Sequence, residues 1–163
     1  MSKIQNLNDL FVHGLKDVYY AEKQAVKSLS TMAEKATNSE LATLLREHKT
    51  QSETQIERLE KVFELAGEKA EAVKCEAMDG ILKEAKHLME ETPDPETRDA
   101  AIIFSAQAVE HYEITRYGSL ATYAERLGMD EAADLLGDTL GEEEESDEKL
   151  SRLAEDKLNK KAV

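Results

Sequence analysis

The sequence has little of what strands, disulfides and sharp turns require. Its 163 residues include 2 prolines, 7 glycines, 1 cysteine and no tryptophan, and only 5% are aromatic. A lone cysteine excludes an intramolecular disulfide, which fits a reducing compartment. Alanine, leucine, glutamate and lysine dominate instead, and these residues favour helices over strands. We therefore expect an all-α protein.

Long apolar runs and excess positive charge are also absent. No stretch approaches the ~18 apolar residues of a membrane span, and the N-terminal segment lacks the apolar run of a secretory signal. The net charge of -14 comes from 35 acidic against 21 basic residues. A surface this acidic repels phosphate backbones. The sequence thus predicts a soluble, cytoplasmic protein that binds neither nucleic acid nor membranes.

The spacing of apolar residues predicts four long helices and one short helix. The long helices are expected at about residues 7–36, 39–66, 95–127 and 130–159, and the short amphipathic helix at 75–91 lies in the connection between the second and third. Capping and helix-ending residues support these bounds. They are Asn6 or Asn8, a Thr37–Glu40 capping box, Asp94 followed by Pro95, Gly67 and Gly128.

The chain repeats itself at an offset of 91 residues. Aligning residues 18–66 with 109–157 without gaps gives 15 identities in 49 positions, and Glu22 falls on Glu113. A duplicated helical hairpin, at roughly 7–66 and 95–159, accounts for this pattern. Two such hairpins bury their apolar stripes best against each other. We therefore predict a single domain over 1–163, a ferritin-like four-helix bundle with a long crossover between the second and third long helices.

Carboxylates interrupt the apolar stripes of three predicted helices. Glu22 lies in the first stripe, Glu113 in the third, and Glu143 and Asp147 in the fourth, while the second helix adds His48 where its stripe turns polar. Buried carboxylates need protons, basic partners or a hard cation. Oxygen ligands with some imidazole suit Fe or Mn better than Zn. The sequence therefore predicts that these five residues bind one or two Fe or Mn ions.

A purely structural role for the carboxylates is the alternative. They can share protons in a polar layer, or pair with the basic residues Arg116, Lys23, Arg58 or Lys149. Four such carboxylates on three helices, with one pair duplicated, favour metal over this alternative. The neighbouring Glu110 is expected to be solvated, paired or indirectly supporting, His111 to lie at the surface, and Cys75 to pack as a small hydrophobe.

Five segments of the sequence match a known pattern. They are LNDLFVHGLKDVYYAEKQAVKSL, QIERLEKVFE, KCEAMDGILKEA, RDAAIIFSAQAVEHYEITRYGSLATYAERLG and LLGDTLGEEEESDEKL. Together they resemble the YciF/YciE family of ferritin-like bacterial proteins over essentially the whole chain. The resemblance implies a ferritin-like bundle, a homodimer and a link to general stress responses. It also implies that the metal-site residues are Glu22, His48, Glu113, Glu143 and Asp147.

One departure from that family pattern affects the predicted site. Family members often have H-x-E-E-T in the second helix, where this chain reads His48-Lys49-Thr50-Gln51-Ser52. A carboxylate is therefore missing, which implies a single tightly held ion or a weakly held second one.

Two functions follow as hypotheses. The first is metal binding in a bacterial stress response, with Fe(II) oxidation or peroxide detoxification in the bundle core, although the sequence leaves open whether the protein is an enzyme. The second is a non-catalytic dimeric helical interaction module.

Overall fold

The protein is described by a computed structural model over residues 3–163, and it is helical with no strand in that range. The elements are α1 (Leu7–Lys35), α2 (Ser39–Leu65), α3 (Glu76–Glu91), α4 (Pro95–Arg126), α5 (Asp130–Leu153), a π-helical segment (Ala154–Leu158) and α6 (Asn159–Lys161). The all-α prediction is confirmed. Residues 1 and 2 of the predicted single domain lie outside the described residues. None of the helices in 3–163 has both the length and the apolar character needed to cross a bilayer.

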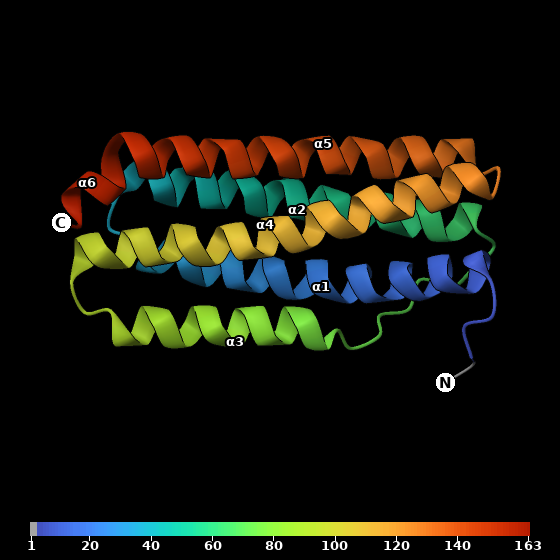
Figure 1. Cartoon of the computed structure of the whole chain (residues 1–163), viewed down its shortest axis with the longest axis horizontal. Helices are drawn as coiled ribbons and strands as arrows, with labels where there is room; N and C mark the ends of the chain where they lie inside the picture. Colours follow the sequence, from blue (N-terminus) through green and yellow to red (C-terminus); the bar gives the residue numbers. More distant parts are fainter. Residues whose placement is uncertain (1–2) are drawn as a thin grey trace.

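Four long helices lie side by side, and α3 lies outside them (Figure 1). Helix α1 packs against α2 and α4, and α5 packs against the same two helices, so the four enclose a shared core. Helix α3 belongs to the long connection between α2 and α4, and it packs on both α4 and α1. The pairs α1–α2 and α4–α5 correspond to the two segments related by the internal repeat.

Side-chain caps and two glycines set the ends of the long helices. Asn6 accepts a hydrogen bond from the backbone of Asp9, and Asp94 accepts one from the backbone of Thr97. Gly67 and Gly128 have φ values of 70° and 73°, a region that disfavours side chains and suits the residue just after a helix. These caps and stops are the ones predicted from the sequence.

The start of α2 differs from its prediction. The Thr37–Glu40 capping box is wrong, because Asn38 is the N-cap and accepts hydrogen bonds from the backbone N–H groups of Glu40 and Leu41. The backbone N–H groups of Thr37 and Asn38 donate instead to Asp99 of α4, at 2.7 and 2.8 Å. A buried carboxylate from another helix therefore holds the α1–α2 turn.

Replacing Asp99 tests this tie between the hairpins. Asp99→Ala leaves two backbone donors without their acceptor, and we expect it to lower the free energy of unfolding by about 2–3 kcal/mol. The exposed Asp138→Ala on α5 is the matched control and should change stability by less than about 0.5 kcal/mol. Urea unfolding followed by circular dichroism measures both. Equal effects of the two substitutions would contradict a structural role for Asp99.

The apolar spacing predicts one continuous C-terminal helix over 130–159, and the structure contradicts this. Helix α5 ends at Leu153, and π-helix follows over Ala154–Leu158. A π-helical turn contains more residues than an α-helical turn, so it rotates the residues that follow it. Leu153, Ala154 and Leu158 are all buried in one apolar cluster. The wider turn therefore lets these three residues be buried together, although their spacing does not fit one face of a continuous α-helix.

The crossover is fixed to the bundle through Cys75 and Tyr112. Cys75 is buried, as predicted, and its thiol caps α3 and lies 3.0 Å from the Tyr112 hydroxyl of α4. The same hydroxyl donates to Asp17 of α1 at 2.5 Å. Burial raises the pKa of the Cys75 thiol, so this cysteine is a packing residue with a protonated side chain.

A polar layer divides the core of the bundle into two apolar parts. One part includes Leu29, Leu41, Ile102 and Leu150, and the other includes Leu15, Leu59, Leu120 and Leu136. On each long helix, buried polar side chains fall between the two parts. They are Glu22, His48, Ser52, Gln55, Glu110, Glu113, Glu143 and Ser146.

Candidate metal centre

Four ionisable side chains from three helices meet in the polar layer. His48 of α2, Glu110 and Glu113 of α4, and Glu143 of α5 each offer one ligand atom, and these atoms all lie within 4.8 Å of one another. All four side chains are buried, and Glu113 and Glu143 have 0% exposure. Ligands held about 2.1 Å from one ion lie up to about 4.2 Å apart. Only small side-chain movements are therefore needed to surround an ion.

Both ring nitrogens of His48 lie near carboxylates of this cluster. Its Nδ1 lies 2.5 Å from Ser146 Oγ and 3.3 Å from Glu110 Oε1, whereas its Nε2 lies 3.5 Å from Glu143 Oε2. Burial lowers the pKa of His48, and the charges of Glu143 and Glu142 only partly oppose this, so the ring is neutral near pH 7. With the proton on Nδ1 toward Ser146, the Nε2 lone pair faces the carboxylates and is able to bind a cation.

The carboxylates lack most of the partners that buried charges need. Within residues 3–163, neither oxygen of Glu113 has a hydrogen-bond partner, and one oxygen each of Glu110 and Glu143 has none. The other oxygen of Glu143 accepts from Gln55 Nε2 at 2.5 Å. Burial, reinforced by neighbouring acids, raises the pKa of Glu110 and Glu113 well above the usual range. The cluster is therefore poised to exchange protons for a cation.

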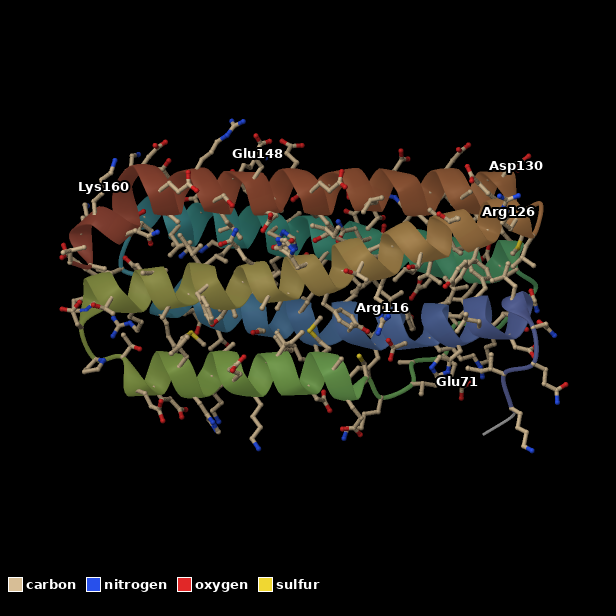
Figure 2. The ribbon with its side chains drawn as sticks, in the orientation of Figure 1. Glu71, Arg116, Arg126, Asp130, Glu148 and Lys160 are labelled. Carbon is tan, nitrogen blue, oxygen red and sulfur yellow. The ribbon has the colours of Figure 1, made fainter. Side chains whose placement is uncertain are left out.

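None of the expected basic partners reaches these carboxylates. Arg116 pairs with Asp17 and stacks on Tyr112, and Figure 2 shows it between α1 and α4. The other three also interact elsewhere: Lys23 lies over the ring of Tyr19, Arg58 binds Glu142, and Lys149 binds Glu145. Ion pairing with basic residues is thus excluded as the structural alternative, and protonation or a cation remains.

Glu22 lies next to the cluster with a partner of its own. Its side chain has 0% exposure, and its Oε1 accepts a hydrogen bond from the Tyr117 hydroxyl at 2.6 Å. Burial and the nearby charge of Glu143 raise the pKa of Glu22. Its ligand atoms are not within the 4.8 Å group. Tyr117 is the tyrosine whose hydroxyl contacts Glu22. The hydroxyls of Tyr19, Tyr20 and Tyr112 donate instead to Glu60, Asp79 and Asp17.

Asp147 is placed at the edge of the bundle instead of its centre. Its side chain is 21% exposed, and it accepts from Gln107 Nε2 at 3.0 Å and lies 3.1 Å from Nε2 of the exposed His111. The inward position on this turn of α5 belongs to Ser146, because Glu143, Ser146 and Leu150 follow the core-facing spacing. The structure therefore brings Glu22, His48, Glu113 and Glu143 together and leaves Asp147 outside. In the acidic run Glu142–Glu145 of α5, Glu144 and Glu145 are exposed. Glu148, labelled in Figure 2, lies on the outer face of the same helix.

Glu110 is the cluster residue that sequence reasoning missed. It is 1% exposed although it borders the predicted stripe. Helix α4 is contacted by α1, α3 and α5, so its buried face is wider than a single stripe. The internal repeat carried a usable signal, because Glu110 aligns with the aromatic Tyr19, which is also buried.

Comparison with known proteins identifies the family. The model of a domain of unknown function, DUF892, matches residues 6–163. The chain belongs to the DUF892 family. Protein YciF from Escherichia coli K12 is 44% identical over 160 residues, which cover 98% of this chain and 96% of YciF. The resemblance found in the sequence is confirmed.

Several solved structures share the fold of this chain. The E. coli stress protein YciF matches with a TM-score of 0.92 at 44% identity, covering 96% of this chain and 99% of YciF. YcfI from Rhodopseudomonas palustris, for which a structural role has been suggested, matches with a TM-score of 0.89 at 47% identity, covering 91% and 95%. A Xanthomonas campestris protein at 24% identity and a TM-score of 0.72 shares the fold, with coverage of 91% and 90%.

On α2 the polar layer contains Ser52 at the position where the repeat-related helix α5 has Glu143. Ser52 is fully buried, and its Oγ has no hydrogen-bond partner among residues 3–163. Gln51 is only half-buried. The side of the layer near Ser52 and Glu22 is consequently poorer in ligands than the side near His48.

Proposed function

We propose that this protein is a ferritin-like metal-binding protein of the bacterial stress response. The observation that carries the proposal is the buried group of His48, Glu110, Glu113 and Glu143, which has ligand spacing and no lysine or arginine partner among the described residues. The similarity to the stress protein YciF supports the physiological setting. We assign the protein to the cytoplasm and expect it to be a homodimer.

The donor set suits iron or manganese. Three carboxylates and one imidazole are hard to borderline ligands, which Fe and Mn accept, whereas structural Zn sites usually contain thiolates. Cys75, the single thiol, is held by α3 and Tyr112 instead. Ser146 and Gln55 would orient His48 and Glu143 as outer hydrogen-bonding partners do in metal proteins.

The reaction most consistent with this setting is oxidation of Fe(II) by oxygen or peroxide. A bound iron or manganese ion supplies the redox chemistry. The chain's own residues would exclude bulk water, since all four ligands are buried, and would release protons as the ion enters. Glu110 and Glu113 are the groups with raised pKa values from which such protons would come.

Metal-dependent stability tests the proposal. Protein purified without chelator should contain near-stoichiometric Fe or Mn, and reloading the metal-free protein at about 100 times the Kd should add about 2.7 kcal/mol of stability. That gain raises the melting temperature by roughly 5–10 °C for a chain of this size. Differential scanning calorimetry with and without chelator measures the shift. Stopped-flow mixing of the Fe(II)-loaded protein with peroxide then tests for turnover. Absence of metal, with no uptake on reconstitution, would refute the proposal.

A non-catalytic helical interaction module is the second candidate. The structural role suggested for the similar YcfI favours it. An unaltered melting temperature in the presence of chelator and of added Fe(II) or Mn(II) would support this candidate against metal binding.

A further inference from the structure

The internal repeat allows the two sides of the polar layer to be compared residue by residue. An offset of 91 relates each member of the cluster to a position on the opposite side. The pairs are His48 with Thr139, Glu110 with Tyr19, Glu113 with Glu22, and Glu143 with Ser52. All four counterparts are buried, with exposures between 0% and 4%. Each cluster position therefore has a buried counterpart, which is again a glutamate at Glu22 and a different residue type at the other three positions.

The second side offers one carboxylate where the first side offers three carboxylates and an imidazole. The positions of His48, Glu110 and Glu143 are taken by a threonine, a tyrosine and a serine. Neutral hydroxyls of threonine and serine are weak ligands, and the hydroxyl of the tyrosine, Tyr19, donates to Glu60 instead. Glu22 is the one carboxylate of this side. Its Oε1 already accepts the hydrogen bond from Tyr117, and Tyr117 aligns with the apolar Val26.

A fixed positive charge also lies on the second side. Arg58 donates to Thr139 Oγ1 at 2.6 Å and to both oxygens of Glu142 at 3.0 Å. Thr139 is the repeat counterpart of His48, so a guanidinium contacts the position where the first side has an imidazole lone pair. The Arg58 side chain is 17% exposed. Because Thr139 Oγ1 already accepts from Arg58 and donates to the backbone carbonyl of Leu135, this position offers no free ligand atom to an ion.

We infer that the protein binds one metal ion on the side of His48, and that the repeat-related position binds none because Arg58 and the Tyr117–Glu22 hydrogen bond occupy its ligand atoms. This inference rests on the proposed function and refines its stoichiometry. It also separates the two duplicated glutamates. Glu113 belongs to the ion site, and Glu22 belongs to the second side.

Manganese binding to a repeat-related pair of variants tests the inference. Wild type, Glu22→Gln and Glu113→Gln are dialysed against Mn(II) and analysed for metal per chain. We expect one ion in the wild type, one in Glu22→Gln with an affinity within about tenfold of wild type, and none in Glu113→Gln. The two substitutions match each other in chemistry, burial and place in the repeat, so they control for each other.

Electron paramagnetic resonance of the Mn(II)-loaded wild type gives a second readout that does not depend on any variant. An isolated ion and a coupled pair have different hyperfine patterns, and we expect the pattern of the isolated ion. Two ions per wild-type chain, a coupled spectrum, or loss of the ion in Glu22→Gln would overturn the inference while leaving metal binding intact. No manganese in the wild type would overturn the proposed function and the inference together.

Discussion

Replacing Glu113 by glutamine is expected to abolish metal binding and to make the metal-free protein more stable. Glu113 is completely buried, and neither of its oxygens has a hydrogen-bond partner among residues 3–163. Glutamine keeps the shape of the side chain and removes the ligand charge, so metal affinity should fall about 100-fold or more. Without metal, the amide avoids the cost of a buried ionisable group, and stability at pH 7 should rise by about 1–2 kcal/mol.

These opposite effects distinguish Glu113 from an ordinary core residue. Calorimetry with and without Mn(II) measures both on one sample. Glu144→Gln, at an exposed position of α5, is the matched control and should leave both quantities at wild-type values. A Glu113→Gln protein that binds Mn(II) as tightly as wild type would remove Glu113 from the site. A substantially less stable metal-free variant would show that its carboxylate has partners in solution.

The metal-free protein is expected to lose stability as the pH rises above about 4.5. Burial raises the folded-state pKa of Glu22, Glu110 and Glu113 above their ordinary value of 4.5. The stabilising contribution of such a group is fully present below its unfolded pKa and is lost as the pH rises through its folded pKa. Each carboxyl that stays protonated only in the folded state therefore lowers stability by about 1.4 kcal/mol per pH unit in that window.

Bound metal should reverse this dependence. The ion competes with protons for the same oxygens, so its affinity rises with pH while the metal-free fold weakens. Urea unfolding from pH 5 to pH 7, in chelator and in excess Mn(II), measures the two slopes. In chelator, Glu113→Gln should make the fall of the unfolding free energy with pH less steep, by up to the contribution of one proton, about 1.4 kcal/mol per pH unit. A metal-free stability that is constant or increases over this window would contradict the expected protonation of the cluster.

The fold was predictable because its determinants are local. Asn6 and Asp94 cap helices through their own neighbours, and Gly67 and Gly128 end helices through their backbone conformation. The Thr37 capping box failed because Asn38 offered a better acceptor and a residue 61 positions away, Asp99, took the free backbone groups. The prediction of a continuous C-terminal helix failed for a similar reason, since burial in the assembled core outweighed local spacing at the π-helical segment.

The candidate site was predictable in part. Glu22 and Glu113 stood out because each interrupts an apolar stripe and the repeat superimposes them. Glu110 was expected outside the site and Asp147 inside it, and the structure places each the other way round. Helical spacing alone does not say how many neighbours a helix has, or which of two adjacent residues points into the core. Helix α4 packs against α1, α3 and α5 and buries Glu110, and Ser146 takes the place expected for Asp147.

His48 has a further consequence because it comes from a different hairpin than the other three ligands. Glu110, Glu113 and Glu143 lie on α4 and α5, whereas His48 lies on α2. An ion held by all four would fasten the two halves of the duplicated chain together. Separating the hairpins would then require breaking the bond to the imidazole first. The bound ion should therefore slow unfolding more than it accelerates folding, so that the lifetime of the native state becomes a measure of how much metal the cell supplies.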